Sequence, residues 1–555
     1  MYILGLGGSD HDVSTTLMKD EKIVCAIEEE RVSRKKYGFN SNLLLGQSRK
    51  YVLNAEGITL DDVDLIVVDD ILPNTVYYGV RNRNLHFVNH HLLHAASAYY
   101  PSGFDEAAIL IVDGAGSLVN HDGKQGLECI SYGYGKGNKI EIFNKVVGEK
   151  YHTSSMGVEE PYQTGDPDNS LGYFYRLISH YCGFNFIDKS NFYYTEDGKT
   201  MGLAPYGSDK YYKLIRPFVH LLEDGQIQID LRSGAFEEVL EKIVEDESEG
   251  DEFKKKADLA WAGQKILEEA MVHIANYLYE VTKCPYLCIA GGVGLNSVAN
   301  GVILRETPFE EIFVQPASGD SGTSLGAAMW GYYGILNNDR NVSSGYVMEN
   351  AYLGKEYSDD QIRAAFSEFD RVCVAEPIDL AKTVAKLILD GKIIALFAGG
   401  AEFGPRALGH RSILANPLIK DMKDILNKRV KFREEFRPFA PAVLFEYQEE
   451  YFDIKQYTPF MLIVAEVLED KRTLIPSVTH VDGTARIQSV TKENGGIFYE
   501  IIQEFYELTG VPIILNTSFN VKGEPIVETP YDAMRCFMNT NIDYIVMGKY
   551  IISKE

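Results

Sequence analysis

Short apolar runs that end in glycine and aspartate recur in the first half of this chain, and they constrain its fold more than any other feature. Ala108–Val112 is followed by Asp113-Gly114-Ala-Gly116, and Tyr286–Ala290 is followed by Gly291-Gly-Val-Gly294. Further β-rich runs are Tyr2–Gly5, Lys22–Ile27 and Leu65–Val68. Runs of this length bounded by turn residues are typical of strands, and helical patterns alternate with them. We therefore expect an α/β chain, with Tyr2–Gly5 and Lys22–Ile27 as neighbouring strands.

The length of the chain, 555 residues, exceeds what one hydrophobic core usually serves, so we expect at least two domains. A polar, turn-rich stretch, Asn337–Gly345, marks the junction. The predicted domains are residues 1–348 and 372–555, with residues 349–371 as a connecting segment. In the second domain we expect a helix at Asp379–Leu389 and strands at Ile393–Phe397 and Pro512–Leu515.

The glycine turns also suggest a nucleotide. Gly291–Gly294 follows a strand and opens a helix, and backbone N–H groups at a helix start can hold an anion. Close packing at a tight turn explains these glycines equally well. Several strand–glycine–aspartate turns in one half favour the duplicated α/β fold that actin shares with the sugar kinases. Candidate nucleotide contacts here are Gly114, Gly292 and Asn296.

Two histidines in the first half form a candidate metal site. His90 and His94 are four residues apart and share one face of a helix. Asp113 and Asp320 stand at glycine-rich strand exits, where carboxylates can bind a cation or its attached phosphate. Two imidazoles and two carboxylates suit a divalent cation such as ferrous iron, manganese or zinc. Core packing of the histidines is the alternative.

A dense set of cations marks the second half. Arg406 and Arg411 lie in one segment, Lys431, Arg433 and Arg437 in the next. Arginine forks match phosphate and carboxylate, and lysine adds a compact charge. Arg486 follows a turn, while Asn516, Ser518 and Asn520 lie at the end of the strand Pro512–Leu515, where ligands bind in open α/β sheets. The set predicts at least two phosphate-like charges, such as ATP plus an acyl phosphate, although each arginine alone could form a surface ion pair.

The composition narrows the range of partners and compartments. A formal net charge of −26 argues against a nucleic-acid partner, because a phosphate backbone would be repelled. No apolar run approaches the roughly 18 residues of a membrane span, and the N-terminus has the pattern of a strand, not of a leader. Seven scattered cysteines suggest buried thiols in a reducing compartment. We expect a cytoplasmic protein without a membrane partner.

The chain resembles the antibiotic and nodulation-factor O-carbamoyltransferases of the NodU/CmcH type, across nearly its full length. Its motifs, in family order, are HHLLHAASAYY, LIVDGAGS, MGLAPYG, GGVGLNSVANG, EFGPRALGHRSI, REEFRPFAP, DGTARIQSV and LNTSFNVKGEP. The resemblance implies an N-terminal actin-like domain similar to the tRNA threonylcarbamoyl transferase and a C-terminal YrdC-like α/β domain.

The same resemblance implies a division of labour. Iron would occupy His90, His94, Asp113 and Asp320, where it would polarise a carbamoyl carbonyl. The second domain would form carbamoyl-adenylate and pyrophosphate from carbamoyl phosphate and ATP, with Mg²⁺ as a companion of ATP. The activation-site residues of the family map onto Arg406, Lys431, Arg437, Arg486, Asn516 and Ser518, with Asn520 as a neighbour. The carbamoyl group would pass to a hydroxyl of a small natural-product or sugar-like molecule. A homodimer is compatible with this interpretation.

Some positions depart from the family or stay open. Gly400-Ala401 stands where a basic residue is common, and His410 replaces a small or amide residue. His11 is a candidate for orienting or deprotonating the acceptor hydroxyl, with a structural or phosphate-binding role as the alternative. Tyr151–Asn169 could line an acceptor pocket or form a surface loop. Rival functions are a sugar-kinase-like phosphotransferase, a tRNA-modifying enzyme and a non-catalytic nucleotide- and metal-binding protein.

Overall fold

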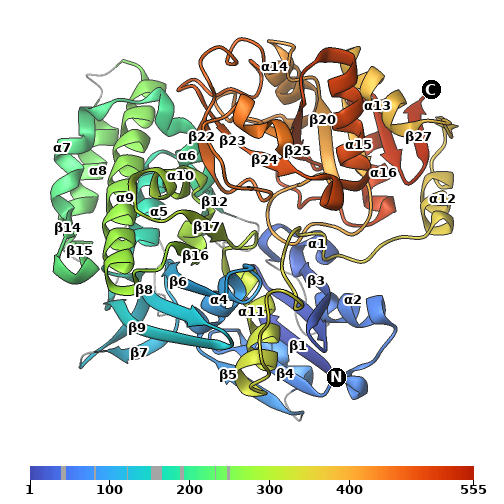
Figure 1. The fold of residues 1–555 in the computed structure, drawn as a ribbon. Coiled ribbons are helices and arrows are strands. Elements are labelled where there is room, and N and C mark those ends of the chain that lie inside the picture. The colour runs from blue at the N-terminus through green and yellow to red at the C-terminus, as the bar shows by residue number, and fades with distance from the viewer. Residues whose placement is uncertain are drawn as a thin grey trace. The chain divides into compact units, whose positions relative to one another are not determined.

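Two sheets with the same strand order build the first part of the fold. A computed structural model describes residues 1–9, 11–38, 46–80, 83–121, 123–151, 166–187, 193–231, 233–246 and 250–555 (Figure 1). The first sheet has the order β3-β2-β1-β4-β5. Its strands are β1 (Tyr2–Gly7), β2 (Ser14–Lys19), β3 (Lys22–Glu28), β4 (Leu65–Asp69) and β5 (Leu85–Val88). The predicted pairing of Tyr2–Gly5 with Lys22–Ile27 is wrong, because Ser14–Lys19 forms a strand between them.

The second sheet repeats this plan. Its strands are β6 (Glu106–Val112), β7 (Leu118–His121), β8 (Lys124–Lys136), β9 (Lys139–Gly148), β16 (Tyr286–Ala290) and β17 (Glu311–Val314). The path β17-β16-β6-β8 continues to β9, and the short β7 pairs with β8 as well. In both sheets the first strand is the central one and the last two are parallel to it. The repeated order confirms the expected duplicated, actin-like α/β fold.

The chain divides into two compact units. Unit 1 comprises Met1–Asp10, Met18–Lys22 and Val63–Val347, and unit 2 comprises His11–Leu17, Ile23–Asp62 and Met348–Glu555. Residues 23–62, early in the sequence, therefore belong to the same unit as the C-terminal half.

Helices α4 and α11 carry the site of unit 1 and pack against each other. Helix α4 (His90–Tyr99) is capped by Asn89, whose side chain accepts from the Leu92 N–H, and α11 spans Thr323–Trp330. A Cβ at Gly326 would lie 1.9 Å from the carbonyl oxygen of Leu93, so only glycine allows the two helices to cross this closely. The crossing brings the turn before α11 close to α4.

The other helices of unit 1 pack around the long helix α9 (Glu252–Thr282). They include α5 (Leu171–Tyr181), α6 (Asp197–Leu203), α7 (Tyr212–Ile215) and α10 (Ser297–Glu306). Helix α8 (Ala235–Glu245) packs against α5 and α7. Small pairs of strands complete the unit: β10 (Lys150–Tyr151) with β11 (Asp166–Pro167), β12 (Asn185–Ile187) with β13 (Tyr193–Thr195), and β14 (Val219–Leu221) with β15 (Ile227–Ile229).

Unit 2 is built on a mixed sheet of eight strands in the order β18-β27-β26-β19-β20-β25-β21-β24. Their bounds are β18 Val372–Ala375, β19 Ile394–Phe397, β20 Arg411–Ala415, β21 Ala440–Leu444, β24 Gln488–Val490, β25 Ile513–Ser518, β26 Tyr544–Met547 and β27 Tyr550–Lys554. A separate pair joins β22 (Val464–Glu466) to β23 (Thr484–Arg486).

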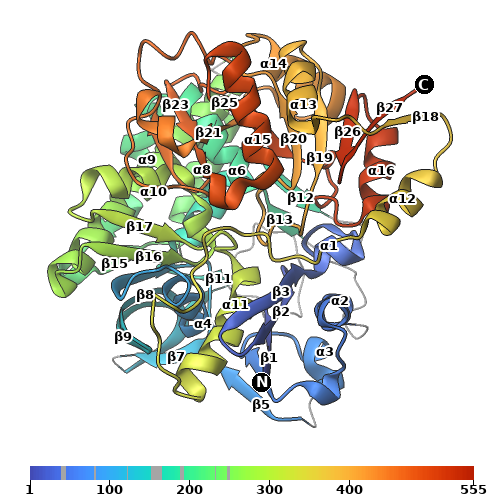
Figure 2. The ribbon, with the colours of Figure 1, turned by 45° about the vertical axis from the view of Figure 1, so that its right-hand side comes forward.

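Two helices cover one face of this sheet and close its core. Helix α13 (Leu380–Leu389) and helix α15 (Lys492–Thr509) lie side by side over the strands (Figure 2). Their apolar side chains, such as Val384 and Ile501, pack with strand residues such as Leu396 and Ile514, all fully buried. The remaining helices are α1 (Glu29–Ser33), α2 (Gln47–Glu56), α12 (Asp359–Ser367), α14 (Met422–Leu426) and α16 (Pro530–Met538). The predicted helix at Asp379–Leu389 is confirmed, with Asp379 as its N-cap.

The helices and the cysteines bear on the expectations drawn from the composition. Among the described residues, no helix is both long enough and apolar enough to cross a bilayer. All seven cysteines are free thiols, and six of them are buried.

Candidate functional site

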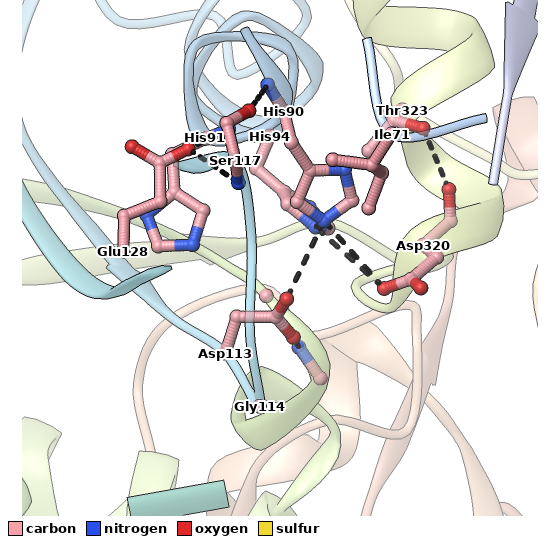
Figure 3. A network of polar contacts seen from close by, with 12 residues as sticks. Ile71, His90, His91, His94, Asp113, Gly114, Ser117, Glu128, Asp320 and Thr323 are labelled. Carbon is pink, nitrogen blue, oxygen red and sulfur yellow. Dashed lines mark hydrogen bonds and ion pairs between the residues drawn. The ribbon is translucent and has the colours of Figure 1, made fainter. Parts of the chain in front are cut away.

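The four predicted metal ligands converge in unit 1. His90, His94, Asp113 and Asp320 each offer one ligand atom, and these atoms all lie within 4.8 Å of one another. The Nε2 atoms of the two histidines are 3.1 Å apart, and His90 Nε2 lies 3.4 Å from Asp113 Oδ2 and 3.8 Å from Asp320 Oδ1. Figure 3 shows both rings and both carboxylates directed at one point. Two nitrogens and two oxygens at this spacing fit one divalent cation with ligand distances of roughly 2.0–2.2 Å.

The orientation of His90 is set from behind by Asp69, at the end of β4. Asp69 Oδ2 lies 2.7 Å from His90 Nδ1, and both side chains are fully buried. A hydrogen bond from Nδ1–H to this carboxylate leaves the Nε2 lone pair directed at the other ligands. The backbone N–H of His90 donates to Ser117 Oγ, which donates to Asp70. The sequence analysis missed Asp69, although it directly follows the predicted strand Leu65–Val68.

The electrostatics of the histidine pair are asymmetric. Burial opposes protonation of His90, but the negative charges of Asp69, Asp113 and Asp320 hold its pKa well above the ordinary value. Burial and the charge of His90 hold the pKa of His94 well below the ordinary value. The Nε2 atoms of the pair are 3.1 Å apart. A divalent cation at this point competes with protonation of the pair, because the surrounding carboxylates already supply negative charge.

Asp113 is held in place by the glycine turn after β16. The backbone N–H of Gly292 donates to Asp113 Oδ1 at 2.8 Å. Gly291 has a φ of +93°, and a Cβ there would lie 2.3 Å from the Val112 carbonyl oxygen, so a side chain cannot be accommodated. Burial would raise the pKa of Asp113, yet its hydrogen bond to His90 holds that pKa below its usual range. This turn therefore holds the carboxylate of a predicted metal ligand.

The other candidate nucleotide contacts of unit 1 have structural partners. Asn296 caps α10, accepting from the Ala299 N–H, and its amide exchanges hydrogen bonds with Gln264. The carbonyl oxygen of Gly114 accepts from Ser170 Oγ at 2.7 Å. Their assignment to nucleotide binding stays a prediction.

A second buried network supports the turn after Asp113. Glu128 accepts from the backbone N–H groups of His91 and Ser117 (Figure 3). It also accepts from the side chain of Asn89, and Lys145 pairs with its other oxygen. Burial opposes ionisation of Glu128, but His91 and Lys145 hold its pKa at about 2. Glu128 thereby ties the start of α4 to the segment that carries Ser117.

The predicted cations gather in unit 2. Burial and the charge of Arg437 lower the pKa of Arg406 to about 10 and that of Arg433 to about 9. Burial, Arg406, Arg433 and Arg437 together lower the pKa of Arg486 well below its usual value. Cations that depress one another's pKa values lie close together with too little negative charge between them. The group of Arg406, Lys431, Arg433, Arg437 and Arg486, called the cation cluster below, is therefore suited to a polyvalent anion.

Lys431 joins this cluster to the end of β25. Its ammonium donates to Ser518 Oγ at 3.0 Å and to Asn520 Oδ1 at 3.0 Å, and also to both backbone carbonyl oxygens. Ser518 Oγ in turn donates to Asn520 Oδ1 at 2.7 Å. Burial, followed by the charges of Arg433 and Arg437, holds the pKa of Lys431 well below its ordinary value. The predicted trio of Lys431, Ser518 and Asn520 is thus one connected group.

The side chains of Asn516 and Arg411 form hydrogen bonds with other groups of unit 2. Asn516 donates to the Ala407 carbonyl oxygen at 3.1 Å and to Gln488 Oε1 at 2.7 Å. Arg411 is fully buried, donates to the carbonyl oxygens of Ala398 and Glu528, and stacks on Phe397. Their predicted ligand roles stay predictions, because these contacts are to the protein itself.

The loop that carries Arg406 is organised around the buried carboxylate of Glu402, which no sequence pattern singles out. Glu402 Oε1 accepts from the backbone N–H groups of Leu408, His410 and Arg411. His410, one of the departures from the family pattern, stacks on Tyr352 with ring centroids 3.5 Å apart and contacts the Gly400 carbonyl oxygen through Nδ1. His410 therefore occupies a packed site at the base of this loop.

Two further predictions concern the acceptor. His11 lies in unit 2, with Nδ1 3.0 Å from Asp12 Oδ2, and is partly exposed. Of the candidate acceptor segment Tyr151–Asn169, residues 152–165 lie outside the described part of the chain.

Family models and curated relatives match both the N-terminal and the C-terminal part of the chain. A family model described as the carbamoyltransferase N-terminus matches residues 2–77 and 72–329, and one described as the carbamoyltransferase C-terminus matches residues 385–554. Nodulation protein NolNO of Sinorhizobium fredii is 35% identical over 98% of this chain and 79% of its own length. Nodulation protein NolO of Bradyrhizobium diazoefficiens is 33% identical over 84% of this chain and 79% of its own length.

Solved structures show only distant similarity. A full-length HypF in a phosphate- and nucleotide-bound form aligns with a TM-score of 0.37 and 16% identity, covering 61% of this chain and 56% of that chain. A ROK hexokinase from Thermus thermophilus aligns with a TM-score of 0.32 and 10% identity, covering 61% of this chain and 100% of that chain.

Proposed function

This chain belongs to the carbamoyltransferase family, and from that premise we propose that it is an ATP-dependent O-carbamoyltransferase that activates and transfers the carbamoyl group at two different sites. The observation that carries the proposal is the cation cluster of unit 2, in which the buried Lys431 lies with half-buried arginines that lower one another's pKa. Such a cluster supports binding of a polyvalent anion in a chain whose net charge is −26.

The proposed activation joins a carbamoyl group to AMP at the cation cluster. Carbamoyl phosphate, ATP and one water give carbamoyl-adenylate, pyrophosphate and orthophosphate, so that atoms balance. Arg406, Arg437 and Arg486 bind the phosphate oxygens and stabilise the charge that builds up on the departing pyrophosphate. Lys431, held by Ser518 and Asn520, adds a point charge at the end of β25. No side chain needs to attack the substrate in this step.

The proposed transfer takes place in unit 1 at the four converging ligands. The acceptor hydroxyl oxygen attacks the carbamoyl carbon, the bond from this carbon to the phosphate oxygen breaks, and AMP leaves. His90, His94, Asp113 and Asp320 would hold a divalent cation, which supplies Lewis-acid polarisation of the carbamoyl carbonyl when bound. Iron is our proposal for this cation.

The acceptor is proposed to be a small molecule with a free hydroxyl group, of natural-product or sugar-like character. His11 is our candidate to orient or deprotonate this hydroxyl, and the Asp12 carboxylate beside its Nδ1 would favour the imidazolium that proton transfer creates. We also propose that the protein acts in the cytoplasm.

The proposal is tested by incubating the purified protein with ATP and carbamoyl phosphate in the absence of acceptor. Pyrophosphate release that depends on carbamoyl phosphate is expected. Release of ADP without pyrophosphate would instead favour the sugar-kinase-like reaction and exclude adenylate formation.

A further inference from the structure

The loop that carries Arg406 is fastened on its C-terminal side by residues of unit 2. The carbonyl oxygen of Ala407 accepts from the Asn516 side chain. The backbone N–H groups of Leu408, His410 and Arg411 all donate to Glu402 Oε1. Glu402 itself is fully buried. The backbone just after Arg406 therefore has little freedom.

The N-terminal side of the same loop is fastened at Gly404 by residues from the start of the chain. Gly404 donates its N–H to Glu28 Oε1, and its carbonyl oxygen accepts from Arg31 Nη2 at 2.6 Å. Glu28 ends β3 and Arg31 lies in α1, and the exposed fractions of their side chains are 7% and 1%. Both polar groups of one residue are thus held by two buried side chains, and Arg31 Nε lies 3.9 Å from Glu28 Oε2.

Arg34, at the end of α1, docks this segment on a second loop of unit 2. Its guanidinium donates to the carbonyl oxygens of Ile526 and Pro525 at 2.6 and 2.9 Å. Its Nε lies 3.6 Å from Asp532 Oδ1. These contacts keep the segment from Glu28 to Arg34 close to the loop that follows Asn520.

The position of Arg406 depends on these hydrogen bonds to the loop backbone. Its Nε is buried and has no hydrogen-bond partner among the described residues. The backbone between Gly404 and Ala407 fixes the Cα of Arg406 and the direction in which its side chain leaves the loop. A charge aimed by a fixed backbone is ready for an anion without prior rearrangement.

We propose that Glu28 and Arg31 are positioning residues for the anion site, because they hold the Gly404 peptide and thereby aim Arg406. These two residues fall within the N-terminal family match, at residues 2–77, whereas Arg406 falls within the C-terminal match, at residues 385–554. The activation site is therefore completed by the N-terminal part of the chain. This inference rests on the proposed function only for the identity of the anion.

Its test measures binding of inorganic pyrophosphate to the full-length protein by calorimetry, together with kcat and KM for carbamoyl-phosphate-dependent pyrophosphate release. The variants are R31M, E28M, R406A and the double variant R31M/R406A. E28Q retains an acceptor for the Gly404 N–H and serves as the conservative rescue. R363M changes an exposed arginine of α12 that pairs with Asp359, and serves as the control.

We expect R31M and E28M to weaken pyrophosphate binding about tenfold, and E28Q and R363M to bind like the wild type. In the R406A background, R31M should cause no further loss, because residues that act through one another are not additive. The same pattern is expected in KM for carbamoyl phosphate, whereas loss of folded protein alone would lower the apparent kcat at unchanged KM. If R31M fails to fold, E28M and the double variant E28M/R406A carry the same comparison, because E28M removes the acceptor of the Gly404 N–H.

Wild-type affinity in R31M and E28M, or losses that multiply in the double variant, would overturn the inference. A wild-type protein that does not bind pyrophosphate would also overturn it, whatever its turnover. Coupled binding without any pyrophosphate release from ATP and carbamoyl phosphate would contradict the proposed function alone.

Discussion

Asp69 and His90 form a buried pair in which a carboxylate oxygen lies 2.7 Å from the ring nitrogen that faces away from the other candidate metal ligands. The pair joins the end of β4 to the start of α4, so the first sheet orients a side chain of a helix. A ligand oriented in this way needs no rotamer change when the cation binds.

Replacing Asp69 by asparagine should weaken cation binding about 10- to 100-fold, because the amide orients His90 less strongly and lowers its basicity. The measurement is titration of metal-depleted protein with Fe²⁺, Mn²⁺ or Zn²⁺ under reducing conditions. D64N is the matched control, because Asp64 is exposed just before the same strand. Equal affinity in D69N and D64N would show that Asp69 does not serve the metal site.

Lys431→Met should reduce pyrophosphate and ATP affinity by about tenfold or more, which corresponds to about 1.4 kcal/mol. It should also lower thermal stability without ligand, because the oxygens of Ser518 and Asn520 lose the buried ammonium from which they accept. Calorimetry and thermal melting measure both effects. K428M, at an exposed lysine of the same segment, is the control. Wild-type anion affinity in K431M would remove Lys431 from the anion site.

Polyvalent anions should stabilise the protein beyond any effect of ionic strength. An anion that relieves repulsion within the cation cluster binds the folded state only, and at 100 times its dissociation constant this contributes about 2.7 kcal/mol. We expect pyrophosphate to raise the melting temperature, and sodium chloride at equal ionic strength to have a smaller effect. R406A should lose most of the difference. An equal shift in R406A would place the stabilising anion elsewhere.

His410 makes a specific prediction about acid stability. Burial, opposed by the charge of Glu402 and reinforced by that of Arg411, lowers its pKa from 6.5 to about 4. A lowered histidine pKa means that the unfolded state binds the proton more readily, so the free energy of unfolding falls as pH drops from about 6.5 towards about 4. H410N lacks this group, and its unfolding free energy should decline less steeply over that interval. Parallel pH profiles from denaturant titrations would contradict the assignment.

Much of the fold could be predicted because its signals are local. Alternating apolar runs and glycine turns located β6, β16 and β19, and Asp379 located the start of α13. The converging side chains of the candidate metal site could be predicted because His90 and His94 share a helix face and Asp113 ends a strand. The strand Ser14–Lys19 was missed, so the predicted neighbour of β1 was wrong.

Other features depend on long-range packing that no local pattern encodes. The hydrogen bond between Arg31 and Gly404 joins residues 373 positions apart. The sequence around Arg31 contains no pattern that indicates Gly404 as its partner. Gly292 and Asn296 fit a phosphate-binding pattern equally well. In the structure the Gly292 N–H donates to the Asp113 carboxylate, and Asn296 is the N-cap of α10. Only the hydrogen-bond partners of each polar group, which the fold brings together, separate a structural role from a ligand-binding role.

The division of the chemistry between two sites is tested most directly by exchange of labelled pyrophosphate into ATP, measured with carbamoyl phosphate and without acceptor. The account predicts exchange in the wild type, near-wild-type exchange in H94A, whose metal site is impaired, and loss of exchange in R406A, whose anion site is impaired. Exchange that survives in R406A, or that disappears in a folded H94A protein, would contradict it.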